Sequence, residues 1–337
     1  MSKFLLSAML ILASVGAYAA QLTATLQSGS ALTPFYGETA LQDALDASKD
    51  GDVITLSPGT FRSVDIQKQV SIVGSYAFSE DSFTEATNIQ GVRIYSDNVV
   101  VEGVRTDNDM TLYGASNVEV TRCYAKIFRS WSYMENTYCD NTIVRDCIFR
   151  EVHMDKFTNA YFSNCGIGRF KTSNEKAYPA LIENCNIALF SAIAGTSTVD
   201  TSCQAYAIYR NCFLGLYNYT GTYGNAKLTL SSPSEFHDCL FVHEDKHSGM
   251  VNKYELTFQC PVENCVEWVM AAASHYDSER EVPTYESHEP YVYNDISYGP
   301  SNPKYRPSIP EVVASEIDNH TDDEGAINVK ITAVAHD

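Results

Sequence analysis

A cluster of basic side chains stands out in the middle of this strongly acidic chain. Residues 121–171 contain eight Lys and Arg residues but only five Asp and Glu, a balance of +3 in a chain of formal charge −19. Guanidinium groups can grip carboxylates or sulfates with two parallel hydrogen bonds, and nearby aromatic rings can stack on sugar faces. The pattern therefore predicts contacts with an acidic glycan. The side chains expected to make them are Arg122, Lys126, Arg145, Arg150 and Trp131.

Composition limits the classes of function. The 337 residues include 42 acidic and 23 basic side chains, so a general nucleic-acid binder is excluded, because phosphate binding needs an excess of Lys and Arg. Apolar residues make up 45% of the chain, enough for a sizeable core. The basic cluster then has two interpretations: a glycan site, or outward charges that pair with neighbouring Asp and Glu and serve solubility.

The first residues have the pattern of a targeting segment. A basic start at Lys3, an apolar run from Phe4 to Val15 and the small-residue site Ala17-Tyr18-Ala19 are typical of a secretory signal peptide. The run is too short for a membrane span, and no later stretch reaches about 18 apolar residues. We therefore expect residues 1–19 to be a signal peptide and the protein to be secreted, without a transmembrane segment.

A repeat indicates the elements that would position the basic side chains. Short segments, most ending in Asn-Cys or Asp-Cys, recur in steps of 18 to 27 residues from Gly103 to Cys265. Asn and Asp tolerate the left-handed backbone of a sharp corner, and apolar residues flank each Cys on both sides. We therefore expect each repeat unit to form a strand, a corner and a second strand that begins with an inward Cys. The predicted corners are Asp146, Asn164, Asn184, Asn211, Asp238 and Asn264 before the Cys, and Asp97, Asn117, Asn141 and Asn159 before the first strand.

Aligning the repeats on the Cys, or on Gly103 in the first of them, also predicts which side chains point inward and which outward. The residue three positions before the aligned one is apolar in every repeat, and in the first repeat this inward residue is Val100. Arg122 and Arg145 are expected in one outward column on adjacent coils, and Lys126 and Arg150 in another. Stacked coils would turn these columns into a basic stripe along the axis.

The repeat predicts the fold. One unit cannot bury its apolar face alone, but a stack of units can, so we expect an all-β parallel β-helix of about nine coils over residues 53–270. A sandwich or barrel of short strands is the alternative, although its turns would not repeatedly place Asn before a small inward residue. Residues 20–52 should contain a capping helix from Thr39 to Asp50, opened by a Thr39-x-x-Gln42 capping box and closed by Gly51.

Residues 51–75, GDVITLSPGTFRSVDIQKQVSIVGS, carry a family resemblance. They are similar to the opening coil of secreted right-handed β-helix proteins of the pectin-lyase-like superfamily, and the resemblance extends over roughly Thr39 to Trp268. It implies right-handed coils. The superfamily includes polysaccharide lyases, glycoside hydrolases and adhesins, so the resemblance implies a fold rather than one activity.

The lyases of that superfamily use calcium-bound carboxylates and an Arg or Lys base. The resemblance therefore implies a lyase, ahead of a hydrolase, if this protein is an enzyme, although none of the family's extended catalytic signatures is present. On the resemblance alone, calcium would be a cofactor held by Asp107, Asp109 and Asp140. The catalytic groups would come from Arg145, Lys156 and Asp155.

Seven of the ten cysteines fall in one inward column. Adjacent coils would hold these side chains parallel and about 4.8 Å apart, whereas the Cβ atoms of a disulfide lie about 3.8 Å apart. The spacing favours a ladder of buried free thiols over bridges within the column. Cys139, Cys203 and Cys260 lie off the column, so a local bridge involving them stays open.

The C-terminal segment, residues 271–337, has a different character. Residues 277–337 hold 13 acidic and 4 basic side chains and six prolines, and the alternation from Ala326 to Ala335 then predicts a strand. That strand would either cap the solenoid or belong to an attachment module.

The sequence thus predicts a secreted protein that binds or degrades an extracellular polysaccharide. A non-catalytic adhesion or structural protein is the alternative. A lyase would bring carboxylates together beside an Arg or Lys, whereas a binding protein would show an aromatic and basic stripe without converging acids.

Overall fold

The computed structural model describes residues 22–75, 77, 86–131, 137–171, 180–194, 198–200, 207–217, 226–231, 234–244, 246–247, 250–251, 254–270, 291–293, 296–298, 311–317 and 329–334. Over these residues the protein is almost entirely β-structure, with a single helix, α2 (Ala40–Ala47). No helix in this part of the chain is long and apolar enough to cross a membrane. The predicted signal peptide, residues 1–19, lies outside the described residues.

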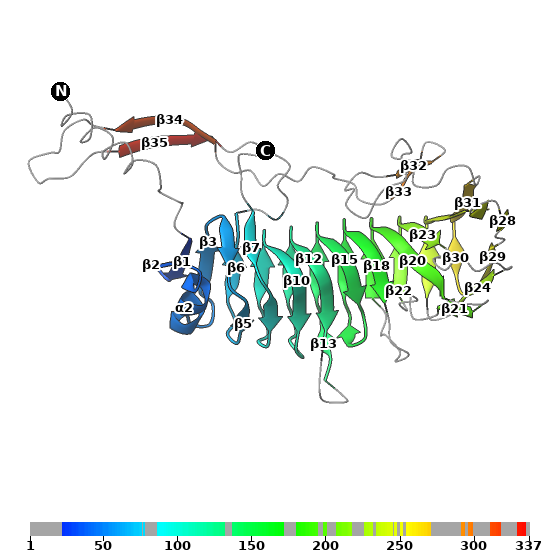
Figure 1. Cartoon of the computed structure of the whole chain (residues 1–337), viewed down its shortest axis with the longest axis horizontal. Coiled ribbons are helices and arrows are strands. Elements are labelled where there is room, and N and C mark those ends of the chain that lie inside the picture. Colours follow the sequence, from blue (N-terminus) through cyan, green and yellow to red (C-terminus); the bar gives the residue numbers. More distant parts are fainter. Residues whose placement is uncertain are drawn as a thin grey trace, which may run out of the picture. The chain divides into compact units, whose positions relative to one another are not determined.

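Two long sheets form the body of the molecule, and their strands lie side by side along its length (Figure 1). Sheet A is ordered β2 (Ala31–Tyr36), β1 (Thr23–Ser28), β3 (Val53–Leu56), β6 (Ser71–Val73), β9 (Val100–Glu102), β11 (Glu119–Thr121), β14 (Ile143–Arg145), β17 (Tyr161–Ser163), β19 (Ala180–Glu183), β22 (Ala207–Arg210), β25 (Glu235–His237) and β30 (Val262–Glu263). Sheet B contains β4 (Gly59–Phe61), β5 (Val64–Ile66), β7 (Thr87–Ile89), β8 (Val92–Ile94), β10 (Arg105–Leu112), β12 (Tyr124–Ser130), β15 (Ile148–His153), β18 (Gly166–Lys171), β20 (Asn186–Ala194), β21 (Thr198–Asp200), β23 (Phe213–Tyr217), β26 (Leu240–Glu244) and β31 (Val266–Met270).

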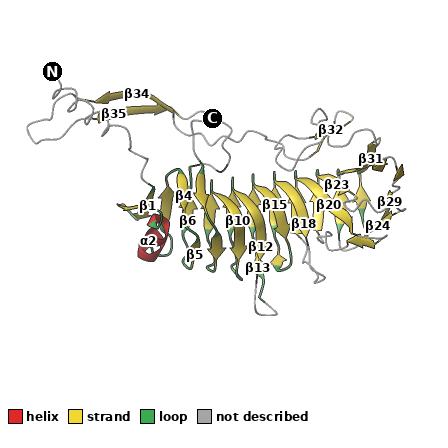
Figure 2. Ribbon diagram, in the orientation of Figure 1, coloured by secondary structure: helices red, strands yellow, loops and turns green. Residues whose placement is uncertain are grey.

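The chain alternates between the two sheets. It leaves a strand of sheet A, turns a corner and enters sheet B, so that neighbours within a sheet are one coil apart in sequence (Figure 2). From β3 onward the pairs of sheet A are parallel, as are those between β10, β12, β15 and β18. This is the arrangement of a parallel β-solenoid, the all-β class that the repeat predicted.

Shorter sheets lie beside the two long ones. β13 (Cys139–Asp140) pairs with β16 (Phe157–Thr158), and β24 (Ala226–Ser231) with β29 (Tyr254–Gln259), both in parallel. Two small hairpins, β27 (Lys246–His247) with β28 (Met250–Val251) and β32 (Tyr291–Tyr293) with β33 (Ile296–Tyr298), are antiparallel.

From β9 onward, a residue with positive φ holds the corner after each sheet A strand. Its main-chain N–H donates to a carbonyl of the next coil, as from Asn184 to Arg210 and from Asn211 to His237, both at 3.0 Å. From β11 onward the φ values lie between 49° and 55°, in the left-handed region that Asn and Asp tolerate. The column consists of Arg122, Asp146, Asn164, Asn184, Asn211, Asp238 and Asn264. It is half-buried to exposed rather than buried.

Two positions of the predicted repeat were wrong by one residue. Gly103 takes the corner, with φ 64°, and not the place of the Cys, so the inward residue of that coil is Val101, paired with Val120, instead of Val100. Asn98 rather than Asp97 occupies the other corner. Glycine, which has no Cβ, fits a left-handed corner as Asn does, and a slip of one residue exchanges the two faces of a strand.

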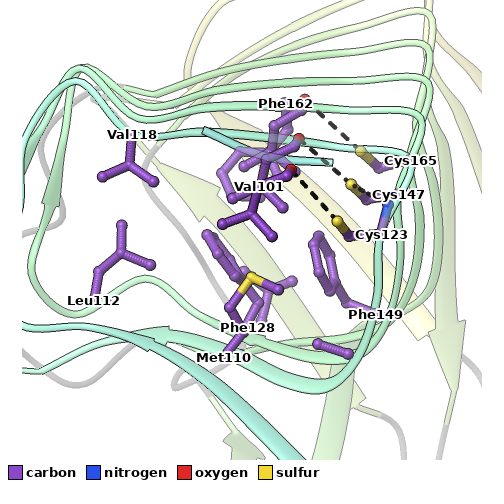
Figure 3. Packing of buried hydrophobic residues seen from close by; sticks show 14 of the residues in the cluster. Val101, Met110, Leu112, Val118, Cys123, Phe128, Cys147, Phe149, Phe162 and Cys165 are labelled. Carbon is purple, nitrogen blue, oxygen red and sulfur yellow. Dashed lines mark hydrogen bonds between the residues drawn. The ribbon is translucent and has the colours of Figure 1, made fainter. Parts of the chain in front are cut away.

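The cysteine column forms one wall of the core. Cys123, Cys147 and Cys165 lie one above another with their thiols pointing inward, near Phe128 and Phe149 (Figure 3). The Cys147 thiol donates to Val120 O at 3.5 Å, and its sulfur accepts from the main-chain N–H of Cys123 at 3.3 Å. The nine cysteines among the described residues are free thiols, so the column is the thiol ladder that the spacing favoured; Cys203 lies outside these residues.

Helix α2 and the β1–β2 hairpin lie at the N-terminal end of the stack (Figure 1). Leu41, Ala44 and Leu45 are buried on one helix face. β1 pairs antiparallel with both β2 and β3, which extends sheet A beyond the first coil.

Thr39 is the N-cap, so the predicted start of the helix is confirmed, but the predicted C-terminal end and the capping box were wrong. The helix stops at Ala47 rather than Asp50, and the capping box does not form: Thr39 Oγ1 donates to Asp43 Oδ2 at 3.1 Å and accepts no main-chain N–H of the first turn. A lysine side chain from the first coil caps the C-terminal end of helix α2. Lys68 Nζ donates to the carbonyls of Leu45, Asp46 and Ser48 at 2.7–2.8 Å, and these bonds take the place expected for Gly51.

The C-terminal hairpin belongs to a separate compact unit, residues 304–337. β34 (Glu311–Ile317) pairs antiparallel with β35 (Val329–Val334). β35 falls within the segment 326–335 predicted as a strand, whereas most of the acidic segment 271–337 lies outside the described residues.

Candidate functional site

Arg122 and Arg145 do not share an outward column, so this prediction was wrong. In the register of β11 and β14, Thr121 lies opposite Arg145, whereas Arg122 occupies the corner with φ 55°. Both guanidinium groups also make ion pairs with the preceding coil. Arg122 pairs with Glu102, and Arg145 with Glu119 at 3.2 Å. Arg122 directly precedes its Cys, at the position that Asn or Asp occupies in later coils, whereas Arg145 lies two residues before its Cys.

Lys126 and Arg150 do share a column, as predicted. The register of β12 and β15 pairs Ala125 with Phe149 and Ile127 with Glu151, which places Lys126 opposite Arg150 on the outer face of sheet B. Both side chains are exposed, and within the described residues neither makes a hydrogen bond or ion pair. They remain available to an anionic ligand.

The three catalytic candidates come from two parts of the coil. Arg145 lies on β14 of sheet A, whereas Asp155 and Lys156 lie in the turn between β15 and β16. Lys156 Nζ is 5.3 Å from the centre of the Tyr138 ring, and its main-chain N–H donates to Ser130 Oγ at 2.9 Å. No contact within the described residues joins Arg145 to the other two.

The three calcium candidates are engaged separately. Asp107 accepts from Arg105 at 2.8 Å, and Asp109 pairs with Arg129 at 2.5 Å. Asp140 accepts from Thr158 Oγ1 at 2.7 Å and Asn159 Nδ2 at 2.8 Å, and these bonds lower its pKa. Over the described residues, no group of three or more His, Cys, Asp and Glu side chains is placed to hold a metal ion.

An aromatic column crosses three coils at the end of the sheet B strands. Ile94 pairs with Leu112 and Leu112 with Ser130, so the residues that follow, Tyr95, Tyr113 and Trp131, are in register. The ladder continues through them, because Tyr113 N donates to Ile94 O at 2.8 Å and Trp131 N to Leu112 O at 2.7 Å. We call Tyr95, Tyr113 and Trp131 the aromatic column.

The rings of the aromatic column reach solvent. Tyr95 is 42% and Trp131 44% exposed. The rings of Tyr95 and Tyr113 stack with centroids 4.6 Å apart and an angle of 11° between their planes. Because these two rings are nearly parallel and 4.6 Å apart, they cover each other's facing sides, and the column presents ring edges and polar ring substituents to solvent. A sugar chain that crosses the column can contact these apolar edges and hydrogen-bond to the phenol and indole groups.

Ion pairs flank the aromatic column. Each residue of the column is preceded, two positions earlier in its strand, by Arg93, Thr111 or Arg129, and these three are in register with one another. Arg93 pairs with Asp65, which is the largest cause of a raised pKa at Arg93, so the guanidinium stays charged. The Arg129 guanidinium pairs with Asp109 and lies 5.5 Å from the centre of the Trp131 ring. Fixed carboxylates and guanidinium groups beside exposed rings can accept from and donate to sugar hydroxyls.

The sequence prediction found Trp131 but missed Tyr95 and Tyr113. The available signal was a regular spacing: 113 − 95 = 18 and 131 − 113 = 18. That period was hidden because the repeat was followed through the Cys, which first appears at Cys123. The preceding coil has Gly103 at the corner and Val104 in the place of the Cys.

The chain matches no protein-family model, no curated protein and no solved structure.

Proposed function

We propose that this protein is a secreted, right-handed β-helix of the pectin-lyase-like kind that binds an extracellular polysaccharide on the outer face of sheet B. The observation that carries the proposal is the aromatic column, in which three successive coils each place one aromatic residue in register, exposed at Tyr95 and Trp131 and half-buried at Tyr113. Secretion is supported by the signal-peptide pattern of residues 1–19 and handedness by the resemblance of residues 51–75.

The surroundings of the column favour a glycan. Arg93–Asp65 and Arg129–Asp109 are ion pairs beside the rings, so they present both donors and acceptors to hydroxyl groups. Lys126 and Arg150 add two exposed positive charges on the same face. A polymer with carboxylate or sulfate groups would be held by both features.

Binding without cleavage is the version that we propose. The catalytic candidate Arg145 lies on a different element from Asp155 and Lys156, and the calcium candidates Asp107, Asp109 and Asp140 are engaged by other side chains. An aromatic and basic surface without converging acids is the arrangement expected of a binding protein. The alternative, a pectate-lyase-like enzyme, would release an unsaturated product from the polysaccharide.

The test is binding of the secreted protein to immobilised polygalacturonate, alginate and xylan, measured by interferometry. We expect the parent protein to bind at least one of them, and Tyr113→Ala and Trp131→Ala each to weaken that binding about three- to tenfold, the loss of one aromatic contact. Tyr36→Ala is the matched control, because Tyr36 is 55% exposed on β2.

Unchanged affinity in the double variant Tyr113→Ala/Trp131→Ala, with its thermal midpoint retained, would contradict the site. Failure of the parent to bind all three polymers would contradict the function. The same incubations, followed in the ultraviolet for the unsaturated product of β-elimination, test the lyase alternative.

A further inference from the structure

The aromatic column leads to a hollow at the N-terminal end of the solenoid. Its cavity of about 300 Å³ is lined by Gln42, Leu45, Asp46, Asp65, Gln67 and Lys68. That volume lies at the lower end of the range for small-molecule sites. Helix α2 supplies three of these residues and the segment from β5 onward the other three, beside each other in Figure 1.

The hollow and the column are continuous. Ile66 pairs with Ile94, and Tyr95 N donates to Ile66 O at 2.9 Å, so Gln67 follows in register with Tyr95. Asp65, which lines the hollow, is also the ion-pair partner of Arg93 beside the column. A sugar chain that lies along the rings towards this end would therefore enter the hollow and meet α2.

The polar groups of the hollow suit an uncharged sugar. Lys68 turns its ammonium group to three helix carbonyls, and the charge of Arg93 is matched by Asp65. Two carboxylates, Asp46 and Asp65, can accept from hydroxyls. The Gln67 amide is exposed and, among the described residues, makes no hydrogen bond, so it can donate and accept.

We propose that this hollow is a subsite for the terminal sugar of the bound polysaccharide, and that this terminal sugar is uncharged. The proposal rests on the polysaccharide binding proposed above. Asp65 is neutralised by Arg93, and the Lys68 ammonium group is held by main-chain carbonyls. The carboxylate of Asp46 therefore disfavours a terminal uronate by charge repulsion, and α2 closes the path of the chain. The protein would then recognise chain ends, with the aromatic column holding the next sugars.

If the protein recognises chain ends, its occupancy depends on the concentration of polysaccharide chains. If sugars bind only along the aromatic column, its occupancy depends on the total concentration of sugar units. The probes are xylan and xylohexaose, with polygalacturonate and its hexamer as the acidic pair. At equal sugar concentration we expect xylohexaose to compete for the site more strongly than long xylan. We also expect it to bind at least tenfold tighter than the galacturonate hexamer.

The variant test uses Gln67→Ala, which should weaken xylohexaose binding about fivefold through the loss of amide hydrogen bonds. Gln27→Ala is the matched control, because Gln27 is an exposed glutamine on β1 outside the hollow. Tyr113→Ala reports on the column in the same assay.

The two proposals fail in different ways. If Tyr113→Ala weakens binding while Gln67→Ala does not, or if long and short xylan compete equally per sugar, the terminal subsite is overturned and the column stands. If neither hexamer nor either polymer binds the parent protein, the proposed function is overturned and the subsite with it.

Discussion

Asn211 donates a hydrogen bond from Nδ2 to Oδ1 of Asn184, at 2.8 Å, across two adjacent coils. Both residues occupy the corner column, with φ 49° and 52°. The same contact recurs at the other corner between Asn141 and Asn117, also at 2.8 Å. One residue type thus serves two needs, because asparagine tolerates the left-handed backbone and its amide can bond to its neighbour along the axis.

We expect Asn184→Leu to lower the free energy of unfolding by about 1–3 kcal/mol, since it loses the amide contact and places a bulky side chain at positive φ. Asn184→Gly should cost less, because it loses the contact but keeps the backbone conformation. Urea unfolding followed by circular dichroism measures both. Equal stability of Asn184→Leu and the parent would contradict the role of the ladder.

Alkaline pH should destabilise the protein through the thiol ladder. Burial raises the pKa of Cys147, Cys185 and Cys239 well above the ordinary thiol value of 9.0. The folded protein therefore keeps protons that the unfolded chain releases, so this stability is complete below about pH 9 and falls as the pH rises above it. Under reducing conditions the urea midpoint should drop between pH 8 and about pH 10.5. Cys147→Ala should show a shallower drop, and an identical slope would count against the buried thiol.

The same burial should protect the thiols from reagents. In the native protein at neutral pH we expect the buried column cysteines to be unreactive towards a disulfide reagent, and to react after unfolding without prior reduction. Cys260 and Cys265, which are only half-buried, should be modified first. Peptide mapping by mass spectrometry distinguishes the positions. Bridges between neighbours such as Cys147 and Cys165 would show that the column is oxidised.

The two pairs of basic residues should differ in their contribution to glycan binding. Lys126→Ala/Arg150→Ala should weaken binding to polygalacturonate about tenfold and reduce its dependence on salt, because both side chains are exposed and without an ion pair among the described residues. Arg122→Ala/Arg145→Ala should leave binding within twofold of the parent, since both arginines already pair with glutamates. The reverse ranking in the same interferometry assay would restore the stripe first inferred from Arg122 and Arg145.

Lys68 should stabilise the N-terminal cap. Replacement by Met keeps the apolar stem but removes three bonds to the end of α2, so we expect a loss of about 1–3 kcal/mol. Lys49→Met is the control, because the Lys49 side chain is exposed and makes no hydrogen bond within the described part of the chain. Thermal unfolding compares the two. A matching loss in both variants would point to net charge rather than to the cap.

The sequence alone determined the solenoid. Asn or Asp before an inward Cys can satisfy a left-handed corner and a small core position at once, and six such pairs in succession are compatible with few other folds. The outward position shared by Lys126 and Arg150 followed from the same count. The register failed at Gly103 and Arg122, where other residue types meet the same backbone requirement, and at Asp97, where the neighbouring Asn98 takes the corner.

Tertiary structure decided the candidate site. Partners such as Glu102 for Arg122 and Asp109 for Arg129 lie one coil away, about 20 residues in sequence, at offsets that vary with the length of each loop. The stacking of Tyr113 on Tyr95 and the meeting of α2 with Gln67 likewise depend on how coils are superposed. A local pattern fixes which way a side chain points, but loops of unequal length decide which coil neighbour it meets.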